Sequence, residues 1–321
     1  MEKTFIGIDI SKLTLDFYVK NGNCETHYQI DNTFKAIKKL LKQFDNNIST
    51  IVAMENTGRY NIHLYEFFTK SEMSVYVINP LHLKKSMGLL RGKNDKIDSK
   101  RISVFIEKNY MDLEQWKPSS KVVNLLSVYN TERRSRVKKK AGLQNQLHDL
   151  KKEDKKLIKL NKELILIYDK QIKIIENEII ELIYSDIELK DKYERIQTIP
   201  GVGKVLATLM IVKTKGFSDI KSARKMACYS GVAPFEHRSG SSIYYKPRVS
   251  TMADKELKKV LHLAALSTIR LDNDLARFYK RKVEQGKNKM AVLNAIRNKI
   301  IHRIYAVIKN NSVYNFNLHM S

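Results

Sequence analysis

Cysteine, proline and long apolar runs are scarce in this sequence, and each scarcity excludes a class of protein. The 321 residues include 2 Cys and 5 Pro. Cys24 and Cys228 lie far apart and neither belongs to a CxxC pair, which argues against a disulfide framework and a structural zinc site. No window approaches the ~18 uncharged apolar residues of a membrane span, and the polar N-terminus is unlike a signal peptide. We therefore expect no membrane segment and a cytoplasmic location.

Acidic residues are also scarce relative to basic ones. The chain has 59 Lys plus Arg against 34 Asp plus Glu, a formal net charge of +25. This surplus attracts polyanions, so nucleic acid is the leading partner and an anionic membrane surface the weaker one. A generally lysine-rich proteome is the alternative explanation. The hydrophobic content of 43% is typical of a folded chain rather than a disordered one.

Proline and glycine divide the sequence into three parts. Strand-like runs such as FIGIDI and TIVAM alternate with helix-like runs, which predicts one α/β domain over residues 1–118. Between Pro118 and Pro200 there is no proline, and Leu and Ile recur at three- and four-residue steps. This pattern predicts a long helical hairpin or coiled-coil connector over 119–190, with an ordinary helical-bundle core as the alternative. Residues 191–321 predict a mostly α-helical domain with polar loops at GVAPFEHRSGSS and KPRVS.

Four acidic residues stand where a catalytic site could form. Asp9 and Glu55 each end a predicted strand, the place where sites of α/β proteins form. Asp95 and Asp98 are spaced i, i+3, so a helix would carry both on one face. Adjacent carboxylates repel unless divalent cations bind between them, and two Mg²⁺ ions held this way suit phosphodiester chemistry. The alternatives are local roles in turns, in helix caps and in surface pairs with neighbouring Lys or Arg.

The segment TIPGVGKVLA is similar to a helix-hairpin-helix turn. Gly201 and Gly203 flank one apolar residue, after a proline and before an apolar run. Such a turn presents backbone N–H groups at a helix N-terminus to a phosphate, and Lys204 adds a positive charge beside it. A tight interhelical turn that needs glycine for its backbone angles is the alternative.

The polar stretch APFEHRSGSSIYYKPRVS contains candidate nucleophiles. Ser239 follows a basic residue and precedes a glycine, and its hydroxyl could attack a phosphate, with Ser241 and Ser242 competing for that role. Three cations could bind the phosphate and stabilise the charge that develops on it: Arg238, Lys246 and Arg248. A flexible polar surface loop is the alternative.

In their order along the chain, these motifs resemble the DEDD transposases of bacterial insertion sequences, the family typified by insertion sequence one-hundred-and-ten. FIGIDISK, AMENTGRY and KNDKIDSKRI are similar to the acidic tetrad of its RuvC-like, ribonuclease-H-type N-terminal domain. IPGVGKVLA, ACYSGVAPFEHRSG and GKNKMAVLNAIRNK are similar to its C-terminal transposase domain, so the resemblance covers residues 4–310. Where many members have Ser-Ser-Gly-Gly, this chain has Arg-Ser-Gly-Ser. Alignment on the Ser-Gly step selects Ser239 and leaves Ser241 open.

The resemblance implies an insertion-sequence transposase, a site-specific DNA recombinase. It implies that Asp9, Glu55, Asp95 and Asp98 bind Mg²⁺, and that Ser239 attacks a DNA phosphodiester to form a phosphoserine. It also implies double-stranded DNA at element ends and target, a structured guide RNA, and a homo-oligomer from dimer to tetramer. The expected location is the bacterial cytoplasm, in association with the nucleoid.

Three other functions compete with this one. A Holliday-junction-type nuclease would use the tetrad and a metal-activated water, without a covalent intermediate, and is the main alternative. A noncatalytic DNA-binding protein would need neither the carboxylates nor a metal. A phosphotransferase of the actin or sugar-kinase type would need glycine-rich phosphate loops, which the first domain lacks.

Overall fold

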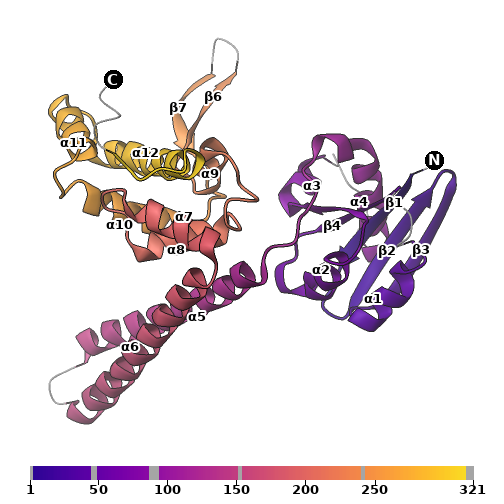
Figure 1. Cartoon of the computed structure of the whole chain (residues 1–321), viewed down its shortest axis with the longest axis horizontal. Coiled ribbons are helices and arrows are strands. Elements are labelled where there is room, and N and C mark those ends of the chain that lie inside the picture. The colour runs from indigo at the N-terminus through magenta and orange to yellow at the C-terminus, as the bar shows by residue number, and fades with distance from the viewer. Residues whose placement is uncertain (1–2, 45–48, 87–93, 151–153, 240–242, 316–321) are drawn as a thin grey trace. The chain divides into compact units, whose positions relative to one another are not determined.

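The chain forms two compact units, Met1–Pro118 and Ser119–Ser321. The computed structural model describes residues 3–44, 49–86, 94–150, 154–239 and 243–315, and Figure 1 labels its elements. No helix within these described ranges is long and apolar enough to cross a membrane. In the second unit one hydrophobic core draws side chains from both 119–190 and 191–321, and the finer boundary at residue 190 stays a prediction.

A five-stranded mixed sheet of order β3-β2-β1-β4-β5 forms the first unit. Its strands are β1 (Thr4–Ile10), β2 (Thr14–Asn21), β3 (Cys24–Asp31), β4 (Thr50–Glu55) and β5 (Ser74–Ile78). Strand β2 pairs antiparallel with β1 and β3, whereas β4 pairs in parallel with β1 and β5. The α/β prediction for this part is confirmed, and the sheet is consistent with a ribonuclease-H-type domain.

Helices cover both faces of this sheet (Figure 1). The short helices α1 (Phe34–Leu41) and α2 (Ile62–Phe68) pack on the face that carries Ile6 and Ile8. The longer α4 (Asp95–Asn109) packs Ile102, Phe105 and Ile106 on the opposite face. The remaining helices of the unit are α3 (Pro80–Ser86) and the 3₁₀ turns Gly58–Asn61 and Tyr110–Asp112. Since side chains alternate along β1, Asp9 belongs to the face that α4 covers.

Two long helices, α5 (Lys121–Asp149) and α6 (Lys155–Tyr184), lie side by side in the second unit (Figure 1). Ion pairs join Arg133 to Glu176 at 2.7 Å and Lys140 to Asp169 at 2.5 Å. The partner's residue number falls by seven as the α5 number rises by seven, which is the pattern of antiparallel helices. This arrangement is the helical hairpin that the sequence allowed.

The Leu and Ile residues that the sequence presents as one stripe are divided in the structure. Ile179 and Ile183 are buried in the unit's core. Leu157, Leu160 and Leu164 are instead 52%, 51% and 45% exposed. All five residues belong to α6, and the core of the unit reaches only the C-terminal part of this helix, where Ile179 and Ile183 lie.

The described part of the second unit also contains six shorter helices: α7 (Ile187–Gln197), α8 (Lys204–Lys213), α9 (Ala223–Tyr229), α10 (Lys255–Thr268), α11 (Asp274–Glu284) and α12 (Lys289–Lys309). Helix α8 is the most enclosed of them, because every residue from Leu206 to Ile211 is buried. A helix that is apolar on most sides is stable only inside a core, and α5, α7 and α10 pack against this one.

The prediction of polar loops between α9 and α10 was wrong, because this segment forms a two-stranded antiparallel sheet. The strands are β6 (Pro234–Ser239) and β7 (Ile243–Val249), with an irregular register between Phe235 and His237. In Figure 1 the pair extends from the helices of this unit. The aromatic and β-branched residues of IYYKPRV favour a strand and outweigh the polar residues that suggested a loop.

The two glycines in the turn between α7 and α8 should differ in how well they tolerate substitution. Gly201 has φ +82°, and a Cβ there would overlap the Thr268 hydroxyl and lie 2.7 Å from the Thr268 nitrogen. We expect Gly201→Ala to destabilise the unit by about 2–4 kcal/mol, from backbone strain plus steric overlap. Urea unfolding followed by helical circular dichroism measures this.

Gly203→Ala is the matched control in the same turn. Gly203 precedes α8 with φ −101°, and no atom lies within 4 Å of a Cβ placed there. The expected loss is below about 1 kcal/mol. Equal losses for the two variants would contradict the role assigned to Gly201.

Candidate active site

Two of the candidate carboxylates lie at the ends of neighbouring parallel strands. Asp9 is the penultimate residue of β1, and Glu55 is the last residue of β4. The parallel register that pairs Ile8 with Met54 brings Asp9 beside Glu55 at the next position. The tertiary structure thus joins two motifs that are far apart in the sequence.

Asp95 and Asp98 lie in the first turn of α4, which confirms the helix that their spacing required. Asn94 caps this helix, since its side chain accepts a hydrogen bond from the backbone nitrogen of Ile97 at 2.7 Å. Acidic residues in a first turn interact favourably with the helix dipole. Asp98 also pairs with Arg101 at 2.8 Å, so the local role that the sequence allowed is present as well.

The four carboxylates act on one another electrostatically. The pKa of Asp9 is raised from 3.8 to about 6, first by burial and then by the negative charges of Asp95, Asp98 and, more weakly, Glu55. A hydrogen bond from the Ile10 backbone opposes these effects only in part. All four carboxylates therefore contribute to one region of negative potential, in which a proton or a metal cation is stabilised.

The chemistry of these donors fits a divalent metal ion. Mg²⁺ prefers carboxylate oxygen ligands, and its charge would relieve the repulsion that raises the pKa of Asp9. In the part of the chain that the structure describes, no three His, Cys, Asp or Glu side chains already form a group that could hold a metal ion. Asp9 is thus close enough to the other three carboxylates to interact with them electrostatically, and ligation of one ion would require the side chains to come closer together.

A fifth acidic residue, Asp16, was missed by the sequence reasoning. The antiparallel register of β1 and β2 places Asp16 directly opposite Asp9. Its side chain is 3% exposed and lies 2.8 Å from His27 Nε2, with Gln29 Nε2 at 3.3 Å. A lone Asp within a strand-like run carries no local signal of this proximity, because it arises from the pairing register.

Two asparagines near the ends of β1 and β4 were also missed. Asn61 is fully buried, and its amide donates to the carbonyl oxygen of Glu55 at 3.0 Å. The amide of Asn32 donates to the carbonyl oxygens of Ser11 at 3.0 Å and Tyr60 at 3.1 Å. These bonds hold the turns that follow the strand ends of Asp9 and Glu55. An asparagine in a turn-rich sequence is too common to reveal such a role.

The glycine turn of the second unit precedes an exposed helix N-terminus. Gly203 is the N-cap of α8 and offers no side-chain acceptor, and the first turn contains no acidic residue. Lys204 is exposed beside it. The backbone N–H groups there have the arrangement that accepts a phosphate.

The serine stretch is described only in part. Ser239 is the last residue of β6, and its backbone lies opposite Ile243. Arg248 is exposed on β7, opposite Phe235. Outside the described part of the structure lie the side chains of Arg238, Ser239 and Lys246 and the whole of Ser241 and Ser242.

Both ends of the β6–β7 pair are attached to helices. The Asp254 nitrogen donates to the Tyr229 carbonyl oxygen at 2.9 Å, and the Tyr229 hydroxyl donates to the Asp254 carboxylate at 3.1 Å. Burial, reinforced by that carboxylate, raises the pKa of Tyr229 and keeps it a donor. Asn294 of α12 donates to the Val232 carbonyl oxygen at 2.8 Å. The strands that carry the serine stretch therefore start from a fixed base.

The raised pKa of Asp9 predicts an unusual dependence of stability on pH. Between about pH 4 and 6 the native state binds more protons at Asp9 than the unfolded state does, so rising pH destabilises the native protein through this group. In the absence of metal at pH 7, Asp9→Asn should therefore stabilise the first unit. We expect about 1–2 kcal/mol, since partial exposure screens the full effect of the shift. The gain should vanish below pH 4.

Urea unfolding in a chelating buffer, followed by fluorescence, measures this gain. The single Trp of the chain, Trp116, stacks on Tyr65 within the first unit and reports its unfolding. Asp16→Asn is the control, because it removes the contact with His27 and should destabilise the same unit at pH 7. An Asp9→Asn protein less stable than the wild type at pH 7 would contradict the electrostatics described above.

Comparisons with known proteins agree with the order of the motifs. Residues 6–152 match a family model described as a transposase of the DEDD type, and residues 193–280 match one described as "Transposase IS116/IS110/IS902 family". The chain is 29% identical to the "Pilin gene-inverting protein" of Moraxella bovis over 332 aligned residues, which cover 99% of this chain and 100% of the relative. The protein of that name from Moraxella lacunata matches to the same extent. An uncharacterized 42 kDa protein of insertion element IS900, from Mycobacterium paratuberculosis, is 27% identical over 40% of this chain and 34% of its own length.

Proposed function

We propose that this protein is a site-specific DNA recombinase that uses the carboxylates of its first unit and a serine of its second. The reason is that the chain belongs to the IS116/IS110/IS902 family of transposases. The family shows the class, a DNA transposase or recombinase with DNA as its substrate. The residues and the metal are the proposal. The observation that carries it is the electrostatic coupling of Asp9 to Asp95, Asp98 and Glu55 in a chain of net charge +25.

The carboxylates would hold Mg²⁺ next to the bound DNA. Asp9 and Glu55 approach from strand ends, and Asp95 and Asp98 from the first turn of α4. When bound, Mg²⁺ would supply positive charge that polarises the scissile phosphate. Members of this DEDD family are typically metal-dependent, which supports the assignment.

Ser239 would be the nucleophile. Its Oγ forms a bond to phosphorus while one bond from phosphorus to a deoxyribose oxygen breaks, and the serine proton ends on that leaving oxygen. The phosphoserine conserves the energy of the phosphodiester, so a second strand end can later displace the serine. Arg238, Lys246 and Arg248 would stabilise the charge that develops on the phosphate.

Nucleic-acid contacts in the second unit would include the turn before α8. The N–H groups that follow Gly201 and Gly203 would bind a backbone phosphate, and Lys204 would add charge beside them. The net charge of +25 suits two nucleic-acid partners, double-stranded DNA and a structured guide RNA. The alternative, a Holliday-junction-type nuclease, would use the same carboxylates with water in place of the serine.

A trapped covalent adduct distinguishes these two reactions. We expect the protein, mixed with Mg²⁺ and nicked DNA that carries the ends of its element, to become linked to DNA through Ser239, because the nick prevents the reverse attack. Proteolysis and mass spectrometry of the DNA-linked peptide locate the residue. Ser239→Ala should lose the adduct completely, and Asp98→Asn should lose it too, since both groups act in the same step.

Ser241→Ala and Ser242→Ala are the matched controls from the same stretch and should keep the adduct. An adduct formed by Ser239→Ala and lost in Ser241→Ala would move the role to Ser241. Cleavage by the wild type without any adduct would favour the nuclease.

Inversion of a DNA segment is a second candidate outcome. The relatives named for pilin gene inversion match 99% of this chain, whereas the IS900 protein matches 40% of it. Inversion and transposition use the same strand transfer and differ in the DNA sites that are joined. A plasmid with two recombination sites in inverted orientation, analysed by restriction mapping, separates inverted products from inserted ones.

The exposed side of α6 predicts self-association. Leu157, Leu160, Leu164 and Ile167 recur at three- and four-residue steps and are about half exposed, at 52%, 51%, 45% and 51%. Such a stripe is suited to packing against a helix of a second copy, which agrees with a homo-oligomer of two to four chains. We expect the double substitution Leu160→Glu and Leu164→Glu to weaken association at least tenfold, as measured by analytical ultracentrifugation.

Leu166→Glu is the control for this surface. Leu166 is 68% exposed on α6 but falls outside the three- and four-residue steps. This variant should associate as the wild type does. A wild-type protein that stays monomeric with and without nucleic acid would rule out the proposed assembly.

A further inference from the structure

Helix α4 approaches strand β1 at Gly7 more closely than a side chain would permit. A Cβ at Gly7 would overlap the backbone oxygen of Ser99 and the backbone nitrogen of Ser103. Both serines are fully buried, and the Ser103 hydroxyl donates to the carbonyl oxygen of Phe5 at 3.2 Å. Two backbones are therefore in direct contact, with only small residues between them.

This contact is adjacent to the carboxylates in both segments. Gly7 and Asp9 project from the same face of β1, because side chains alternate along a strand. Ser99 directly follows Asp98 in α4. The separation between Asp9 and the first turn of α4 is thus set by how closely the helix and the strand meet at Gly7.

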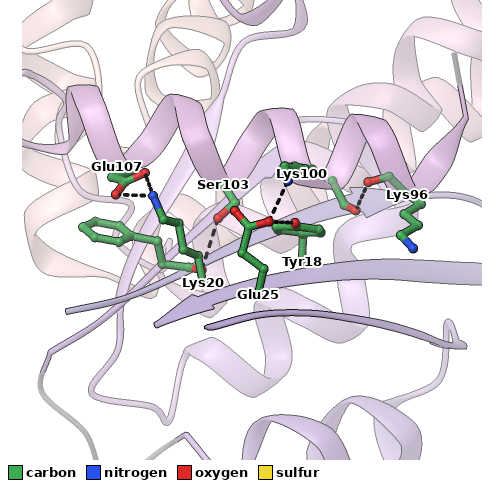
Figure 2. Close-up of polar contacts among 9 residues, drawn as sticks. Tyr18, Lys20, Glu25, Lys96, Lys100, Ser103 and Glu107 are labelled. Atoms are coloured by element: carbon green, nitrogen blue, oxygen red, sulfur yellow. Dashed lines mark hydrogen bonds and ion pairs between the residues drawn. The ribbon is translucent and has the colours of Figure 1, made fainter. Parts of the chain in front are cut away.

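Two ion pairs also attach α4 to the antiparallel side of the sheet (Figure 2). Near its N-terminal end, Lys100 Nζ lies 2.6 Å from the carboxylate of Glu25, which also accepts a hydrogen bond from the Tyr18 hydroxyl. Lys100 lies 5.0 Å from the centre of the Tyr18 ring. Two turns further along, Glu107 pairs with Lys20 at 2.7 Å. Only the first pair lies at the end of α4 that carries the two aspartates.

We propose that Gly7, Lys100 and Glu25 are positioning residues for the carboxylate site. They hold the first turn of α4 at the separation from Asp9 that lets Asp9, Asp95 and Asp98 share one divalent cation. The inference rests on the proposed role of these carboxylates. It adds that the geometry of the site depends on contacts outside the acidic motifs.

The positive charge of Lys100 makes this role testable by the sign of the effect. A lysine near a cation site repels the cation, so loss of its charge alone should raise the affinity for the metal. Loss of its contact with Glu25 releases the end of α4 and should lower that affinity. The two explanations therefore predict opposite changes for the same substitution.

The experiment measures Mn²⁺ binding to the full chain by electron paramagnetic resonance of the free ion, with Mn²⁺ as the probe. We expect Lys100→Met and Glu25→Gln each to weaken Mn²⁺ binding by about fivefold to tenfold, the lower end of what supporting residues contribute to metal sites. Lys100→Arg should restore most of the affinity. Lys20→Met is the matched control: it removes the same residue type from the distant ion pair, and its affinity should stay within about twofold of the wild type.

Gly7→Ala tests the backbone contact independently. It should weaken Mn²⁺ binding by more than about tenfold at a temperature where circular dichroism shows a folded protein. Ile106→Ala is its control, since Ile106 is a fully buried residue near the other end of α4. This control should lower the melting temperature while leaving the affinity unchanged. If Gly7→Ala does not fold, the comparison of Lys100 with Lys20 still decides the question.

Each outcome bears on one proposal alone. A wild-type protein that binds no Mn²⁺ would overturn the proposed cation site itself. A wild type that binds Mn²⁺, together with a Lys100→Met variant that binds equally well or more tightly, would overturn the positioning role and leave the cation site standing.

Discussion

Repulsion among carboxylates is the physical constraint on which the first unit depends. Asp9, Glu55, Asp95 and Asp98 are brought near one another although burial and mutual repulsion raise the pKa of Asp9 to about 6. The rest of the unit opposes this repulsion. Asn94 caps the helix that carries two of the four, Asn61 holds the turn after Glu55, and the contact at Gly7 keeps α4 against β1. A cation bound among these carboxylates would relieve the repulsion that raises the pKa of Asp9.

The second unit satisfies a different requirement, which is to hold a projecting segment on a rigid base. The buried residues of α8 place this helix inside the core, and α5, α7 and α10 pack against it. From this core, Asp254 and Asn294 bind the backbone at Tyr229 and Val232, just before β6 begins. The serine stretch is thus carried by a two-stranded sheet whose base is defined by hydrogen bonds rather than by a flexible loop.

The two units also differ in how they use charge. In the first, the ion pairs Lys100–Glu25 and Lys20–Glu107 join a helix to a sheet. In the second, Arg133–Glu176 and Lys140–Asp169 join the two long helices and leave apolar residues of α6 exposed. Many lysines and arginines of the chain therefore have acidic partners within the fold, and the surplus of +25 remains for contact with nucleic acid.

The sequence by itself determined the class of the elements that carry the carboxylates and the order of the motifs. Period-two alternation in FIGIDI and the i, i+3 spacing of Asp95 and Asp98 are local patterns, and a strand and a helix formed where they predicted. The family resemblance, carried by the same motifs, is confirmed by the matches over 6–152 and 193–280. Local patterns are sufficient to predict this strand and this helix, because the hydrophobic periodicity that distinguishes them extends over only a few residues. The loops expected around Ser239 were wrong because β-propensity and cross-strand pairing outweighed polar composition.

The tertiary structure alone decided which residues meet. Asp16 lies opposite Asp9 because of a pairing register, which depends on how whole strands align rather than on any short motif. A residue with a side chain does not fit at Gly7, because the backbone of α4 occupies the space that a Cβ would need. This helix begins almost ninety residues later in the chain. Leu160 and Leu164 are exposed because the core of the second unit reaches only the C-terminal part of α6. Long-range packing has no local signature in the sequence. The burial of Asp9, its proximity to the other carboxylates and its raised pKa are therefore evident only from the tertiary structure.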